Sequence, residues 1–282
     1  MSASDMLVLI DGEPTEDPAV LLSLVSEKNV SVFETMRVSG SSIFQLSRHL
    51  DRLFESAKTI GIQIPKGKKQ IKAELREALK HTPFQEPFFL RLTILSSHTI
   101  VFVFRRDYPT RLYEEGVDIK TTAVCRNESS AFPPEAKIGQ FLNAILSYLD
   151  PFSADAFELL FLNREGTVTE TRASNFFIVK NKVLETPEPR GILNGVTRRF
   201  VIECARKERF SVCERPITRH DVWKADEAFM TNTTSGIVPV RSLDGRTIGE
   251  GKPGPVTLKL RRRFEMEFRR EVAIRKNSYA PH

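Results

Sequence analysis

The spacing of apolar residues in the first hundred positions changes repeatedly between a strand-like and a helix-like period. In residues 30–38 apolar side chains alternate with polar ones, which is typical of a half-buried β-strand. From Leu46 to Ile60 they return every three or four positions, which predicts an amphipathic helix over residues 46–61. Further strands are expected at residues 6–11, 88–95 and 99–104, and a second helix around Ile71, Leu75 and Leu79. We therefore expect a small α+β unit that ends near residue 110.

The remainder of the chain is predicted to contain short strands joined by turns, together with three helices. The strands are expected at residues 117–125, 157–162, 167–170, 175–180, 183–186, 228–231 and 236–240, and the helices at residues 138–149, 197–207 and 255–275. The segment from Tyr108 to Glu115 is polar and contains Pro109, which makes it the candidate linker. The pattern predicts an α+β protein of two domains, residues 1–110 and 116–282, with a linker at residues 111–115.

The composition is that of an ordinary globular protein. Of the 282 residues, 40% are hydrophobic and 28% are charged. No apolar run approaches the ~20 residues that a membrane helix needs, and the first residues lack the basic start of a signal peptide. We therefore expect no membrane partner and a cytoplasmic location. The three cysteines are widely spaced, which argues against a disulfide framework and against a metal site.

The formal net charge of +6 comes largely from short basic runs at residues 66–69, 261–263 and 269–270. These runs contain no interleaved aromatic residues that could stack on bases, so we interpret them as solvated helix faces and expect no nucleic-acid partner. A basic surface also suits anionic ligands such as phosphates and carboxylates.

Lys137, Glu170 and the segment Gly195-Val196-Thr197 combine an amine, a carboxylate and a helix start. An amine can form a Schiff base with an aldehyde, a carboxylate can keep a pyridine nitrogen protonated, and the N–H groups of a helix start can bind phosphate. These are the three parts needed to hold pyridoxal phosphate. Taken singly, each has a plainer explanation: a solvated lysine, a solvent-facing glutamate at a strand end, and a simple Thr N-cap.

Two further features could contribute to such a site. Thr233 and Thr234 lie in a hydroxyl-rich turn between apolar strands, which is either a second phosphate anchor or only a polar turn. Arg52 lies beside the apolar stripe of the helix at residues 46–61, where arginine usually faces solvent. The case for a phosphate-binding site rests on the joint occurrence of these residues in this order.

Together these segments resemble the class IV pyridoxal-phosphate enzymes of fold type IV. That family includes branched-chain aminotransferases, D-amino acid aminotransferases and aminodeoxychorismate lyase. The resemblance begins at Val32-Phe33-Glu34-Thr35-Met36-Arg37 and extends over nearly the whole chain, and its most specific stretches are residues 166–177, 193–198 and 225–229. It implies a small α/β-sandwich domain, a larger pseudo-barrel domain and a homodimer.

The resemblance also implies a role for each matching residue. Lys137 is the expected catalytic residue and Schiff-base lysine, and Glu170 is the expected partner of the pyridine nitrogen. The phosphate is expected to contact Arg52, Val196, Thr197 and Thr233, with Thr234 adjacent. Phe33, Arg37 and Arg91 fall on the substrate side in branched-chain members, and no metal is expected. Leu142 and Phe89 replace tyrosines of those members, so the resemblance does not imply a particular substrate.

Three functional hypotheses follow. The first is transamination, in which an amino group is exchanged between an amino acid and a 2-keto acid through the lysine Schiff base. The second is a lyase that uses the same cofactor but eliminates pyruvate. The third is a binding protein that keeps the fold without its chemistry.

Overall fold

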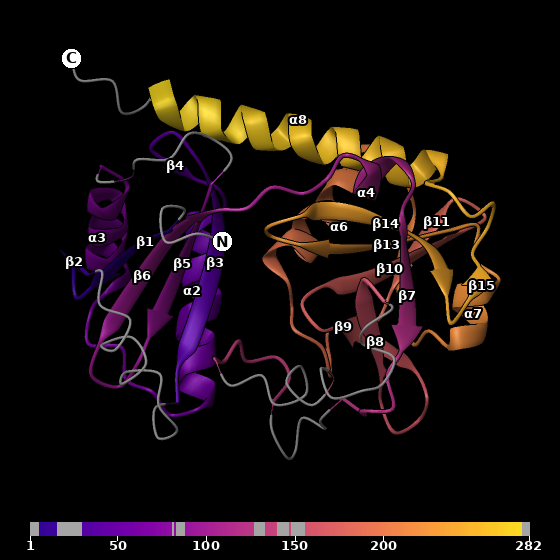
Figure 1. Ribbon diagram of the computed structural model, residues 1–282, viewed down its shortest axis with the longest axis horizontal. Helices are drawn as coiled ribbons and strands as arrows, with labels where there is room; N and C mark the ends of the chain where they lie inside the picture. Colours follow the sequence, from indigo (N-terminus) through magenta and orange to yellow (C-terminus); the bar gives the residue numbers. More distant parts are fainter. Residues whose placement is uncertain are drawn as a thin grey trace. The chain divides into compact units, whose positions relative to one another are not determined.

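The computed structural model describes residues 6–15, 30–80, 82, 88–126, 133–139, 147 and 156–277 (Figure 1). The helix predicted at residues 138–149 lies almost entirely outside the described residues. The chain divides into two compact units. The first contains Met1–Asp107, Ala136–Gln140 and Phe268–His282, and the second contains Tyr108–Glu135 and Phe141–Glu267. The predicted domain limits at residues 110 and 116 stay a prediction.

The first unit is built on a six-stranded antiparallel sheet in the order β2-β1-β6-β5-β3-β4 (Figure 1). Its strands are β1 (Met6–Ile10), β2 (Glu13–Pro14), β3 (Val32–Ser39), β4 (Ser42–Ile43), β5 (Phe88–Ile94) and β6 (Thr99–Arg105), and its helices are α2 (Leu46–Thr59) and α3 (Lys68–Lys80). All the strands and helices predicted for this part of the chain are present.

The alternation along β3 decides which residues enter the core of the first unit. Val32, Met36 and Val38 join a buried cluster with the apolar stripes of α2 and α3. Because side chains alternate across a strand, Glu34 points to this same face. Phe33 and Arg37 therefore lie on the opposite face of the sheet.

The second unit contains a nine-stranded sheet in the order β12-β11-β10-β13-β14-β7-β8-β9, with β15 added to β14. The strands are β7 (Val117–Thr121), β8 (Glu158–Leu162), β9 (Val168–Thr171), β10 (Asn175–Lys180), β11 (Val183–Thr186), β12 (Val212–Glu214), β13 (Glu227–Asn232), β14 (Gly236–Leu243) and β15 (Arg246–Thr247). β9 also pairs with β10, at Glu170 and Asn175, so six of the strands form a closed ring. This barrel-like ring agrees with the predicted pseudo-barrel.

The helices of the second unit are α4 (Arg111–Glu114), α6 (Val196–Lys207), α7 (Arg219–Trp223) and the first part of α8 (Pro255–Asn277). The predictions for α6 and α8 are confirmed within two residues. The sequence reasoning missed α4, β12, β15 and α7, and it extended β7 to residue 125, whereas the strand ends at Thr121. α7 begins with a capping box in which Thr218 and Asp221 bond to each other's backbone N–H groups, a signal that is present in the sequence.

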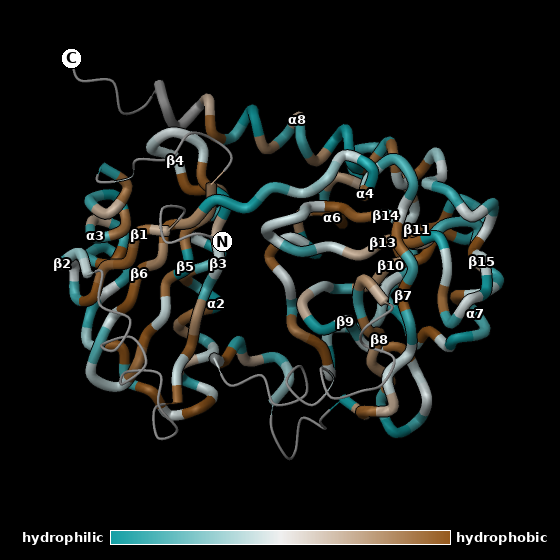
Figure 2. The backbone as a smooth tube through the Cα atoms, in the orientation of Figure 1, coloured by the Kyte–Doolittle hydropathy of each residue, from teal (hydrophilic) through white to brown (hydrophobic). Residues whose placement is uncertain are grey.

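Hydrophobic residues concentrate in the strands of each sheet, and apolar and polar residues alternate along α8 (Figure 2). The residues expected every fourth position in α8 are all buried: Val256, Leu260, Phe264, Phe268 and Val272. Within the second unit Phe264 packs edge-on against Phe200, with 5.6 Å between ring centroids. Among the residues with a described structure, no helix has the length and apolar character required to cross a membrane.

Candidate functional site

The predicted site residues are divided between the two units. The first unit contains Phe33, Arg37, Arg52, Arg91 and Lys137, and the second contains Glu170, Val196, Thr197, Thr233 and Thr234. The two groups are described in turn.

The backbone of Lys137 is tied to the start of β3 and to α2. Its N–H donates to Ser56 Oγ at 3.0 Å, and its carbonyl accepts from the N–H of Phe33 at 3.1 Å. Gly139 continues this pairing by donating to the carbonyl of Ser31 at 2.8 Å. A Cβ on Gly139 would lie 2.1 Å from Ser31 Oγ, so a larger residue would force the Ser31 side chain to move. The lysine is therefore held by a fixed backbone.

The side chains of Lys137 and Arg91 meet at the ring of Phe33. The Lys137 Nζ lies 4.5 Å from the ring centroid and the Arg91 Cζ lies 3.9 Å from it. Arg91 Nε is buried and, among the described residues, has no hydrogen-bond partner. Burial lowers the pKa of the Arg91 guanidinium. A largely buried cation of this kind would be stabilised by an anionic ligand.

Arg37 lies in a different environment from Arg91. Its guanidinium carbon is 3.9 Å from the centroid of the Phe268 ring in α8, a cation–π contact within the first unit. The structure thus brings Arg91, but not Arg37, to the ring of Phe33 beside Lys137.

Arg52 is buried rather than solvent-facing, and its partner is Glu34. Arg52 Nε donates to Glu34 Oε1 at 2.6 Å, and Arg52 Nη2 donates to Oε2 at 2.7 Å. His49 Nδ1 lies 2.7 Å from the same Oε2. Burial alone would raise the pKa of Glu34, but the charges and hydrogen bonds of Arg52 and His49 lower it to about 2. Burial lowers the pKa of His49, so it is neutral and donates its Nδ1–H.

In the second unit, Glu170 is a buried carboxylate with three protein donors. Asn175 Nδ2 donates to its Oε2 at 3.1 Å, and the N–H of Leu193 lies 3.2 Å from both oxygens. Arg126, which is 7% exposed, forms an ion pair with Oε1. These contacts fix the position of the carboxylate, as required of a group that holds a protonated ring nitrogen.

The start of α6 has the character of an anion site. Gly195 is its N-cap, and no side chain caps the first N–H groups. A Cβ on Gly195 would lie 2.1 Å from Asn175 Oδ1, so a larger residue would force the Asn175 amide to shift. The hydroxyl of Thr197, in the first turn, lies 3.5 Å from the hydroxyl of Thr233.

Thr234 and Thr231 differ in how their hydroxyl groups are used. Thr234 Oγ1 donates to Asn232 Oδ1 at 3.1 Å and lies 2.7 Å from the hydroxyl of Tyr108. This hydroxyl is therefore already bonded within the protein. Thr231 Oγ1 is buried without a hydrogen-bond partner among the described residues. Uncapped N–H groups, the Thr197 and Thr233 hydroxyls and a fixed carboxylate fit the phosphate and the pyridine ring of pyridoxal phosphate.

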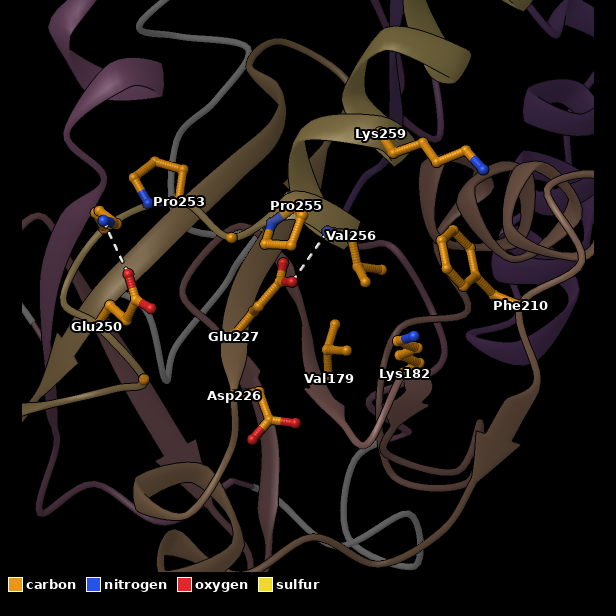
Figure 3. Close-up of a pocket in the computed structure, with 13 residues that line it drawn as sticks. Val179, Lys182, Phe210, Asp226, Glu227, Glu250, Pro253, Pro255, Val256 and Lys259 are labelled. Carbon is orange, nitrogen blue, oxygen red and sulfur yellow. Dashed lines mark hydrogen bonds and ion pairs between the residues drawn. The ribbon is translucent and has the colours of Figure 1, made fainter.

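A separate pocket of about 640 Å³ lies beside the start of α8 (Figure 3). None of the predicted site residues lines it. The carboxylate of Glu227 accepts from the N–H of Val256 at 2.9 Å and from that of Thr257 at 2.7 Å. Because Glu227 already occupies the first N–H groups of α8, this pocket offers no free helix start to a phosphate.

Comparison with known proteins identifies the family. The sequence profile described as "Amino-transferase class IV" matches residues 31–243. The chain is 32% identical to a branched-chain-amino-acid aminotransferase of Pseudomonas aeruginosa over 94% of this chain and 93% of that protein. It is 28% identical to a D-alanine aminotransferase of Bacillus licheniformis, over 86% and 89%. The chain belongs to the class IV aminotransferases.

Solved structures support the same assignment. A branched-chain amino acid aminotransferase of T.th., solved with pyridoxamine 5'-phosphate, superposes with a TM-score of 0.84, at 26% identity and 93% coverage of both chains. The branched-chain aminotransferase of Thermoproteus uzoniensis, solved with norvaline, gives 0.80 at 30% identity, covering 93% and 94%. The predicted fold type IV, the pyridoxal phosphate cofactor and the transaminase activity are confirmed, and the lyase alternative is not supported.

Three residues that the sequence reasoning did not propose belong to the surroundings of the candidate site. Glu34 and His49 hold Arg52, and Arg126 holds Glu170. Glu34 could have been found, because it shares the apolar face of β3 with Val32 and a buried acid requires a cationic partner. Arg126 follows the end of a strand, and nothing in the pattern around it indicates its partner.

The Glu34–Arg52 pair predicts an acid-dependent loss of stability. The folded pKa of Glu34 is about 2, below its ordinary 4.5, so its contribution is complete above about pH 4.5 and is lost as the pH falls towards 2. Glu34→Gln leaves a buried cation without its counter-ion and should lower the free energy of unfolding by about 3–5 kcal/mol at pH 7. Denaturant unfolding at pH 7, 5, 4 and 3 measures this difference.

The difference between wild type and Glu34→Gln should stay constant from pH 7 to 5 and shrink below pH 4.5. Glu250→Gln is the control, since Glu250 pairs with Lys252 in solvent, and it should match wild type throughout. A difference that persists undiminished at pH 3 would contradict the assigned ionisation of Glu34.

Proposed function

We propose that this transaminase uses Lys137 as its catalytic lysine and acts on amino acids with apolar, branched side chains. The observation that carries the proposal is the meeting of Lys137 and Arg91 at the ring of Phe33. An amine, a carboxylate-binding group and an apolar wall are thereby brought to one place. Relatives named branched-chain aminotransferases support this substrate class.

Each remaining site residue has a proposed task. Pyridoxal phosphate, when bound, supplies an aldehyde carbon that reacts with amines and a ring that takes up negative charge. Glu170, held by Arg126, keeps a proton on the ring nitrogen. Arg52, Val196, Thr197 and Thr233 bind the phosphate, and Thr234 supports the turn that carries Thr233. The Nζ of Lys137 would take the proton from the α-carbon of the substrate and would deliver it to the former aldehyde carbon of the cofactor, as an amino-group transfer requires.

Lys137→Ala is expected to abolish turnover, because it removes both the covalent attachment of the cofactor and the proton carrier. The visible absorption of the purified protein is recorded while single L- and D-amino acids are added, and the keto acid released is measured in the same samples. Together the two readings show which amino acids act as donors. Lys182→Ala, which removes an exposed lysine in the pocket of Figure 3, is the control and should retain full turnover. An unchanged rate in Lys137→Ala would end the proposal.

Arg91 is proposed to bind a substrate carboxylate, because it lies at the ring of Phe33 together with Lys137, whereas Arg37 lies at the ring of Phe268. Arg91→Met should raise KM for the amino acid about 10- to 100-fold, the effect of losing hydrogen bonds to a charged group. Steady-state kinetics with a series of amino donors measures this change. Arg105→Met, at an arginine that pairs with Asp107 on the surface, is the control and should leave KM unchanged. A normal KM in Arg91→Met would show that another residue binds the substrate carboxylate.

We also propose a homodimer located in the cytoplasm. The side chains of Met6, Ile10 and Phe102 pack on one face of the first sheet and remain partly exposed, which suits coverage by a second copy. The described cysteines are free thiols, as is usual in a reducing compartment. A molar mass in solution near the 32.1 kDa of one chain would contradict the dimer.

A further inference from the structure

Glu34 is a charged residue in a position that otherwise belongs to the core. It lies on β3 between Val32 and Met36, all three side chains have no measurable exposure, and the neighbouring apolar residues pack against α2 and α3. A carboxylate in such a place lowers stability unless it is paired and hydrogen-bonded. An apolar residue would stabilise this core more than a carboxylate does, which indicates that Glu34 has a role beyond packing.

The contacts of Glu34 fix the orientation of Arg52. Two parallel hydrogen bonds, from Nε at 2.6 Å and from Nη2 at 2.7 Å, join one edge of the guanidinium to the carboxylate. Two such bonds set both the position and the plane of the group, which a single bond cannot do. They direct the N–H groups of Nη1 away from Glu34.

His49 fixes the other side of the carboxylate. It lies on α2 three residues before Arg52, so both side chains leave the same face of the helix and reach the same acid on β3. The neutral ring donates from Nδ1 to Oε2 at 2.7 Å. With three donors around it, the carboxylate of Glu34 can occupy only one position, and Arg52 is fixed with it.

We propose that Glu34 is a positioning residue for the cofactor phosphate: it holds the guanidinium of Arg52 in the orientation in which that group binds the phosphate. This rests on the proposed role of Arg52. Glu34 itself does not touch the cofactor and acts only through the arginine.

The proposal predicts an effect that depends on the phosphate group. Pyridoxal has the same ring and aldehyde as pyridoxal phosphate but carries no phosphate. A positioning role through Arg52 should therefore change the affinity for pyridoxal phosphate and leave that for pyridoxal unchanged. A purely structural role would weaken both ligands equally, so the ratio of their dissociation constants separates the two roles.

The experiment measures the dissociation constants of pyridoxal phosphate and pyridoxal by equilibrium dialysis of the full-length apoprotein. Glu34→Gln and Arg52→Met should each reduce the preference for the phosphorylated ligand by about tenfold or more, the usual effect of disturbing hydrogen bonds to a charged group. Glu34→Asp keeps the charge but shortens the side chain, so its preference should fall between those of wild type and Glu34→Gln.

Glu227→Gln is the matched control. Glu227 is also a buried carboxylate, but it caps α8 in the second unit, so its loss should lower the melting temperature without changing the ligand preference. If Glu34→Gln does not fold, the comparison of wild type with Glu34→Asp decides the question in the same assay.

The outcomes separate this inference from the proposed function. A preference that is unchanged or increased in Glu34→Gln, while Arg52→Met lowers it, would overturn the positioning role alone. An increase would mean that Glu34 competes with the phosphate for Arg52. An unchanged preference in Arg52→Met would overturn the inference together with the proposed role of Arg52.

Discussion

The buried pairing of an arginine with a carboxylate is the interaction on which both halves of the candidate site depend. In the first unit Arg52 is held by Glu34, and in the second unit Glu170 is held by Arg126. The proposed roles differ: Glu34 fixes a cation that we propose binds a phosphate, and Arg126 fixes an anion that we propose holds a ring nitrogen. In each case a residue outside the proposed ligand-binding set holds a residue within it, which suits a preformed site.

The backbone supplies the second constraint. Lys137 belongs to a segment that pairs with the start of β3, and Gly139 lets that segment pass close to the Ser31 side chain. Gly195 is the N-cap of α6, and the amide of Asn175 approaches it closely. Each glycine lies where the backbone that carries a candidate site residue passes close to a residue distant in sequence. The local sequence is therefore consistent with the long-range contacts at both positions.

The sequence predicted the strands, the long helices and the cofactor class because these rest on local periodicity and on short motifs. The phosphate role of Arg52 was expected only from the family resemblance, because the amphipathic pattern of its helix alone indicated a solvent-exposed position. The strand alternation places Glu34 on the core face, but its pairing with Arg52 and the pairing of Arg126 with Glu170 join residues 18 and 44 positions apart, and no local pattern encodes these pairings. Arg37 and Arg91 could not be separated from sequence, because only the structure shows that Arg91 shares the ring of Phe33 with Lys137, whereas Arg37 lies against Phe268 of α8.

The ring of strands in the second unit closes at a single residue pair, Glu170 with Asn175. The carboxylate predicted to hold the ring nitrogen is thus also part of the seam of the barrel. A substitution at Glu170 that changed the cofactor geometry would also affect the pairing of β9 with β10 that closes the ring. Phe33 and Arg91, which we propose face the substrate, belong to the first unit, so their side chains can change during the evolution of new chemistry without opening the ring.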